Sequence, residues 1–163
     1  MKINLTQNKN FKLFKIISKV AQENNQTVYI VGGYVRDLLM QRKAPTDIDF
    51  VTEQSGIELA KAVGKELGDL KVSVFKTYGT AMIKYKDLDL EFVGARKESY
   101  SEDSRKPAVE TGTLEDDQKR RDFTVNALAI SLNAENFGEL IDPFSGREDM
   151  QNKILRTPLE PAQ

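Results

Sequence analysis

Two aspartates separated by a single residue are the side chains in this sequence best suited to hold a metal ion. Asp47 and Asp49 flank Ile48, in a run that predicts a β-strand over 48–52. Successive side chains of a strand point to opposite faces, so the two carboxylates share one face. Side by side they repel each other unless a cation lies between them. Mg²⁺ prefers oxygen ligands and commonly joins carboxylates to substrate phosphates, so this pair predicts a magnesium site.

A glycine pair ahead of the aspartates predicts a phosphate-binding turn. The apolar run Val28–Val31 predicts a buried strand, and Gly32 and Gly33 then permit a turn into a short helix over 36–42. The backbone N–H groups of such a turn and the start of the next helix favour an anion. Arg36 can bind phosphate through its planar guanidinium group.

Each of these features has an ordinary interpretation when it stands alone. A Gly-Gly pair is typical of any turn, an Asp-x-Asp pair of a solvated strand end, and Arg36 of a helix surface. Their combination within one strand–turn–helix–strand unit favours a functional site. A third carboxylate for phosphoryl or nucleotidyl transfer can come from the predicted strand over 88–93, where Asp89 and Glu91 share a face. An ordinary solvated strand face is the alternative there.

Composition excludes several kinds of site. The 163 residues include no cysteine and no histidine, so disulfides, thiolate chemistry and imidazole chemistry are excluded and any metal must bind oxygen. The absence of cysteine suits a cytoplasmic protein. No apolar run approaches the roughly 20 residues of a membrane span, and the N-terminus has no signal-peptide pattern. The net charge of −1 does not indicate a strongly basic nucleic-acid binder, although Lys119–Arg121 forms a local basic cluster.

The order of predicted elements indicates an α/β fold. Helices are predicted over 11–23, 36–42, 56–67 and 123–132, and strands over 28–31, 48–52, 71–75, 80–85, 88–93 and 153–155. The simplest packing is one mixed, mostly antiparallel sheet with helices on one face. Residues 94–112 are charged and predict a mobile loop, after which Thr113 can cap a short acidic helix.

Three motifs carry a resemblance to a known family. They are Gly32–Leu39 with Asp47–Asp49, Arg120–Ala129, and Leu140–Gly146 with Lys153–Arg156 behind it. The sequence resembles the head domain of tRNA nucleotidyltransferases (CCA-adding enzymes) and bacterial poly(A) polymerases. The resemblance runs from about Val28 to Arg156 and implies the polymerase β-like nucleotidyltransferase fold.

The resemblance also implies roles for individual residues. Asp47 and Asp49 match the metal ligands, which hold two Mg²⁺ ions when nucleotide is bound, and Glu91 matches the third carboxylate. The remaining matches are to nucleotide-binding positions: Gly32, Gly33 and Arg36 at the phosphates, Arg121 at the nucleotide, and Asp122 and Asn126 near the ribose and 3′-end pocket. Asn126 lies four residues after Asp122, so in a helix both face one cavity. The implied partners are ATP, CTP and the 3′ end of a tRNA.

The chain is expected to be a head domain over residues 1–160, without the neck, body and tail in which this family selects the base and holds tRNA. Weak or no activity is therefore expected of the chain alone. A poly(A) polymerase of the same family is one alternative. A small stand-alone nucleotidyltransferase that modifies a drug or a protein is another, and a non-catalytic nucleotide-binding module is a third. The motif Arg120–Ala129 argues against the second, and retention of both Asp47 and Asp49 against the third.

Overall fold

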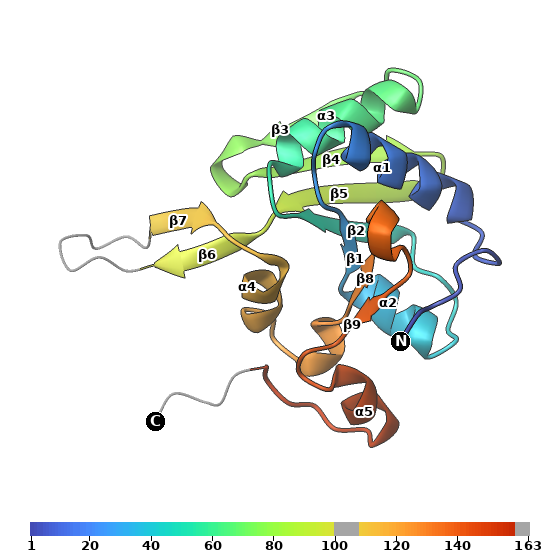
Figure 1. The fold of residues 1–163 in the computed structure, drawn as a ribbon, viewed down its shortest axis with the longest axis vertical. Helices are drawn as coiled ribbons and strands as arrows, with labels where there is room; N and C mark the ends of the chain where they lie inside the picture. The colour runs from blue at the N-terminus through green and yellow to red at the C-terminus, as the bar shows by residue number, and fades with distance from the viewer. Residues whose placement is uncertain (100–107, 159–163) are drawn as a thin grey trace.

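The computed structural model describes residues 1–99 and 108–158, with backbone alone described at 97–99 and 108–111. Its five helices are α1 (Phe11–Glu23), α2 (Gly33–Leu39), α3 (Gly56–Glu66), α4 (Leu114–Lys119) and α5 (Gly146–Gln151), as Figure 1 shows. Its strands are β1 (Tyr29–Val31), β2 (Asp47–Thr52), β3 (Val72–Phe75), β4 (Thr80–Tyr85), β5 (Leu88–Gly94), β6 (Arg96–Ser99), β7 (Ala108–Thr111), β8 (Ala129–Ser131) and β9 (Leu140–Ile141). None of the helices in the described part of the chain has the length and apolar character needed to cross a bilayer.

Seven strands form one twisted sheet in the order β3-β4-β5-β2-β1-β8-β9. The pairs are antiparallel except β2 and β5, which run parallel at the centre. β6 and β7 form a separate two-stranded ribbon that extends away from the sheet (Figure 1). The predicted α/β fold with a mixed, mostly antiparallel sheet is confirmed.

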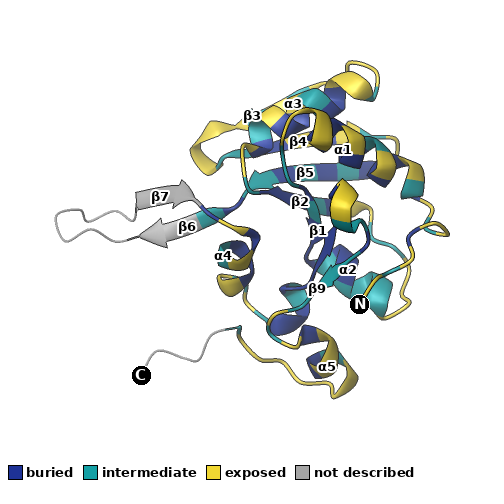
Figure 2. Cartoon of the chain, viewed as in Figure 1, coloured by how far each residue is buried: buried dark blue, intermediate teal, exposed yellow. Residues whose placement is uncertain are grey.

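The main core lies between the sheet and the helices on one of its faces. Phe14 of α1 packs edge-on against Phe50 of β2, with ring centroids 6.3 Å apart, and Phe50 stacks on Phe92 of β5 at 5.0 Å. All three side chains are fully buried, and α3 packs beside α1 over β4 and β5. Figure 2 shows the buried residues concentrated in the central strands and on the inner sides of the helices.

The opposite face of the sheet is covered at one corner. A small cluster there joins Val31, Val51 and Ala129 to Leu114 of α4. Thr113 begins α4 with a reciprocal capping box to Asp116, as the predicted cap required. The rest of this face carries the polar side chains of β2 and β5.

Three local predictions were wrong. Residues 94–112 do not form one mobile loop, since β6 and β7 lie within them; the central part, 100–107, is outside the described residues. Residues 123–132 form no α-helix but a 3₁₀ turn over Thr124–Asn126 followed by β8, which pairs with β1. A continuous apolar run fits a fully buried strand as well as a helix, and sheet pairing decided between them. The segment 153–155 is not a strand. Its backbone bonds to the preceding helix α5 instead of to a neighbouring strand, since Ile154 N–H donates to the Asp149 carbonyl at 2.8 Å.

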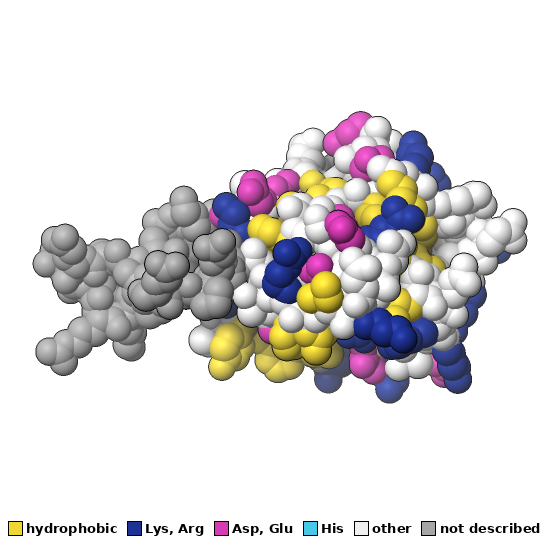
Figure 3. All heavy atoms as spheres, turned by 90° about the horizontal axis from the view of Figure 1, so that it is seen from below, with side chains coloured by type: hydrophobic (Ala, Val, Ile, Leu, Met, Phe, Trp, Pro, Cys, Tyr) yellow, Lys and Arg dark blue, Asp and Glu magenta, His cyan; other side chains and the backbone are white. Residues whose placement is uncertain are grey.

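Seen from below, the end of the molecule that carries α4 and α5 shows Lys and Arg side chains interspersed with acidic and hydrophobic ones (Figure 3). The surface is thus not uniformly basic, as the net charge near zero predicts.

The stacked aromatic pair predicts a sharp contrast between two phenylalanines. Phe50→Ala should lower the free energy of unfolding by about 3–5 kcal/mol, because it opens a cavity under α1. Phe75→Ala, at a side chain that is 47% exposed on β3, should change it by less than about 0.5 kcal/mol. Urea unfolding followed by circular dichroism measures both, and equal losses would contradict this assignment of the core.

Candidate active site

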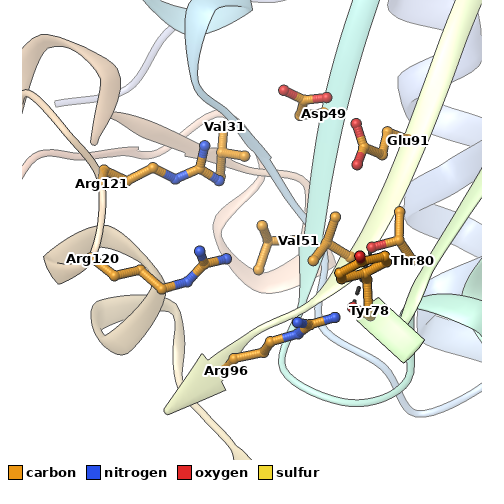
Figure 4. A pocket seen from close by; sticks show the side chains of 10 residues that line it. Val31, Asp49, Val51, Tyr78, Thr80, Glu91, Arg96, Arg120 and Arg121 are labelled. Atoms are coloured by element: carbon orange, nitrogen blue, oxygen red, sulfur yellow. Dashed lines mark hydrogen bonds between the residues drawn. The ribbon is translucent and has the colours of Figure 1, made fainter. Parts of the chain in front are cut away.

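The parallel pairing of β2 with β5 brings acidic side chains from distant parts of the sequence together. Asp47 lies beside Asp89 in the register and Asp49 beside Glu91. Ile48 and Leu90, between them, are fully buried on the helix-covered face, so the acidic residues face the other way. Figure 4 shows the Asp49 and Glu91 carboxyl groups pointing toward one another from the two strands.

The Asp49 and Glu91 carboxyl groups have raised pKa values, although Arg121 lies nearby. Burial raises the pKa of Asp49, and the charges of Asp47 and Asp117 add to this, against the lowering effect of the Arg121 guanidinium and of a hydrogen bond with Glu91. Burial also raises the pKa of Glu91, and the neighbouring charge of Asp49 raises it further. The folded surroundings thus disfavour the ionised forms of both groups, and a nearby cation would favour those forms.

The residues present fit a divalent cation that prefers oxygen. Asp47, Asp49 and Glu91 supply hard carboxylate oxygens from adjacent strands, and a bound cation would offset the burial and the mutual repulsion that raise the pKa values of Asp49 and Glu91. Within the described residues, no group of three acidic side chains is arranged to hold a metal ion by itself. The donor set is an open one, which suits Mg²⁺ because that ion keeps water and phosphate oxygens among its ligands.

Arg121 lies between the glycine turn and the carboxylates. A Cβ atom on Gly32 would come within 3.6 Å of the Arg121 guanidinium and 3.7 Å of an Asp49 carboxylate oxygen. Gly32 also has φ +75°, which strains any residue with a side chain. The backbone conformation thus favours glycine here, as the sequence predicted for a tight turn, and the Arg121 and Asp49 side chains lie at ordinary contact distance from it.

A buried aspartate that the sequence analysis did not select holds Arg121 in place. Asp117 of α4 is fully buried and accepts hydrogen bonds from Arg121 Nε at 3.2 Å and Nη2 at 3.0 Å. Its other oxygen accepts from Arg120 Nη2 at 2.9 Å. One carboxylate therefore orients two neighbouring arginines. The sequence did carry a signal for this contact: Arg120 and Arg121 follow Asp117 by three and four residues, a spacing that brings side chains together along a helix.

Asp49, Glu91 and Arg121 line one pocket of about 250 Å³, together with residues that the sequence analysis did not select. The latter are Tyr78, Thr80, Arg96 and Arg120. Figure 4 shows Arg96, Arg120 and Arg121 reaching into this pocket from the side opposite the carboxylates. The arrangement can place a cation against one wall and phosphate groups against the other.

The other predicted residues form a second group beside this pocket. Arg36 donates through Nη1 to Asn126 at 2.9 Å and through Nε to Asp37 at 3.0 Å, and Asn126 donates to Asp122 at 3.3 Å. Asp122 and Asn126 therefore do face each other, although through a 3₁₀ turn rather than the predicted helix. Arg36 and Asn126 line an adjacent depression of about 440 Å³. Gly33 connects the two groups along the chain. It follows Gly32, which lies near Arg121, and a Cβ atom on Gly33 would lie 3.4 Å from the Arg36 guanidinium group.

Comparison with known proteins shows the family of this chain. Residues 28–156 match the family described as the poly A polymerase head domain. The chain belongs to this family. The A-adding tRNA nucleotidyltransferase of Aquifex aeolicus is 47% identical over 128 residues, which cover 78% of this chain and 15% of that relative.

Solved structures give the same result. A CCA-adding enzyme in an apo form superposes with a TM-score of 0.83 at 37% identity, covering 94% of this chain and 36% of that chain. A tRNA nucleotidyltransferase complexed with a primer tRNA and an incoming ATP analog superposes with a TM-score of 0.76 at 41% identity. The superposition covers 88% of this chain and 39% of that chain. This chain thus spans well under half the length of these relatives.

The raised carboxyl pKa values predict a pH-dependent gain in stability when Glu91 loses its charge. In the presence of EDTA and at pH values above neutral, Glu91→Gln should have a higher Tm than the wild type. The reason is that the ionised form of Glu91 is disfavoured in the folded state. Because the pKa of Glu91 is raised in the folded state, its contribution to the free energy of unfolding is fully present below the ordinary carboxyl pKa. That contribution is lost as the pH rises through the folded-state pKa. The gain should therefore vanish near about pH 4.

The exposed Glu135→Gln is the matched control and should show no such pH-dependent gain. A Glu91→Gln Tm that stays at or below the wild-type value at every pH would contradict the raised pKa.

Proposed function

We propose that this chain is the catalytic part of a metal-dependent, template-independent RNA nucleotidyltransferase that transfers AMP or CMP to the 3′ end of a tRNA. The observation that carries the proposal is the in-register pair Asp49 and Glu91, facing Arg121 and the glycine turn across one pocket. The relatives named as A-adding and CCA-adding enzymes support both nucleotides. A tRNA substrate also agrees with the cytoplasmic location expected from the sequence.

In the proposed reaction the 3′-hydroxyl oxygen of the RNA attacks the α-phosphorus of ATP or CTP. The bond between that oxygen and the α-phosphorus forms, the bond from the α-phosphorus to the pyrophosphate oxygen breaks, and the hydroxyl proton is released. Two Mg²⁺ ions supply stabilisation of the attacking and leaving oxygens when bound. Asp47 and Asp49 would hold them, and Glu91 would hold the ion on the side of the attacking hydroxyl.

The remaining residues bind and orient the nucleotide. Gly33 lets the phosphates approach the backbone, and Arg36 and Arg121 provide guanidinium groups for their charges. Asp117 acts on the phosphate side as a positioning residue, because it fixes the Arg121 side chain. Asp122 and Asn126, linked to Arg36 by hydrogen bonds, are proposed to contact the ribose. Catalysis then consists mainly of positioning and charge stabilisation.

The proposal predicts metal-dependent nucleotide binding by the chain even where turnover is weak. Isothermal titration with a non-hydrolysable ATP analog should give binding that requires Mg²⁺. Asp49→Asn should weaken this binding at least about tenfold, because it removes a metal ligand. Asp89→Asn, two residues before Glu91 on the same face of β5, is the matched control and should stay within about twofold of the wild type.

Binding of the analog that is independent of Mg²⁺ and unchanged in Asp49→Asn would contradict the proposal. That result would favour a nucleotide-binding module without catalysis.

A further inference from the structure

Three large apolar side chains are exposed together at one edge of the sheet. Phe75 ends β3, Tyr78 lies in the following 3₁₀ turn, and Met82 lies on β4. They are 47%, 63% and 36% exposed. We refer to Phe75, Tyr78 and Met82 as the β3–β4 platform.

The β3–β4 platform lies on the same face of the sheet as the carboxylates. In the register Phe75 pairs with Thr80 and Met82 pairs with Glu91, while the alternate residues Ala81 and Ile83 are buried under the helices. Tyr78 and Thr80 line the same pocket as Asp49 and Glu91. The apolar surface therefore continues directly into the proposed active site.

Two arginines border this surface. Arg96 of β6 lies against the turn after Tyr78, since a Cβ atom on Gly79 would be 3.3 Å from its guanidinium group. Among the described residues no acidic side chain forms an ion pair with Arg96. Arg120 is held by Asp117 at 2.9 Å and lines the pocket on the side of Tyr78 and Arg96, as Figure 4 shows.

Asp117 of α4 binds the two arginines that follow this helix, and they point in different directions. Arg121 lies at Gly32 and Asp49, where the nucleotide phosphates are proposed to bind. Arg120 reaches instead toward Val51, on the side of Tyr78 and Arg96 (Figure 4). The pocket thus has a second set of positive groups that the proposed nucleotide site does not use.

We infer that the β3–β4 platform, with Arg96 and Arg120, binds the terminal unpaired nucleotides of the RNA that receives the nucleotide. Exposed aromatic rings beside guanidinium groups match single-stranded RNA, whose bases stack on rings and whose phosphates pair with cations. Bases lie on Phe75 and Tyr78, and the backbone phosphates contact Arg96 and Arg120. The 3′-hydroxyl is thereby directed toward Glu91. This inference rests on the proposed function.

The occupant is assigned from charge and continuity. Two guanidinium groups beside an apolar surface favour a polyanion with flat bases over an apolar protein segment. The surface also leads without a break to the carboxylates, where the RNA 3′-hydroxyl must react in the proposed mechanism.

The test measures RNA and nucleotide binding in the same variants. Fluorescence anisotropy with a labelled single-stranded RNA ending in two cytidines gives the RNA affinity of the chain. Phe75→Ala and Tyr78→Ala should each weaken RNA binding about fivefold or more, because each removes a stacking ring. Tyr78→Phe should stay within about twofold of the wild type. Mg²⁺-dependent binding of the ATP analog should be unchanged in Phe75→Ala, because Phe75 does not line the pocket of Asp49 and Glu91.

A further measurement tests the two arginines. Arg96→Gln and Arg120→Gln should each reduce the slope of log K against log salt by about 0.7, the value for one phosphate contact to a single strand.

Wild-type RNA affinity in Phe75→Ala and Tyr78→Ala would overturn the inference, as would no binding of RNA by the wild type. A third result would also overturn it: a wild-type dimer in sedimentation that Tyr78→Ala converts to a monomer. The β3–β4 platform would then bind a second copy of the chain. Failure of the ATP analog to bind the wild type would instead contradict the proposed function, so the two failures are distinguishable.

Discussion

The structure depends on one pairing, the parallel contact between β2 and β5 at the centre of the sheet. These strands are separated in the sequence by α3, β3 and β4, and their register sets Asp49 beside Glu91. The same register stacks Phe50 on Phe92 on the other face. A slip by one residue would turn the carboxylates into the core and the aromatic rings into the pocket, so the burial of the rings fixes the geometry of the acidic site.

The second constraint is the buried carboxylate of Asp117. It is fully buried, yet the two arginines bound to it keep part of their side chains in solvent. A short helix with a capping box positions this carboxylate over the corner of the sheet. Negative charge on the strands and the two arginines after α4 therefore face each other across a pocket, and among the described residues no ion pair joins these arginines to Asp49 or Glu91. The space between them suits a metal and a phosphate chain.

The sequence predicted the central unit because its signals were local. A strand, a glycine turn and an alternating Asp-x-Asp pattern each depend on near neighbours, and Gly32 and Asp49 lie where those patterns required. It did not predict β8, because an apolar run buried on both faces has no periodicity of its own and is decided by pairing with β1. Arg96, Tyr78 and Asp117 were not selected because their proximity to the carboxylates depends on tertiary contacts.

Anomalous diffraction from crystals of the chain with Mn²⁺ and a non-hydrolysable ATP analog would show whether Asp49 and Glu91 form the two sides of a metal site. We expect a metal peak beside β2 and β5, bound by Asp49 and in contact with phosphate oxygens. A peak bound elsewhere, with the Asp49 and Glu91 carboxyl groups still hydrogen-bonded to each other, would contradict this expectation.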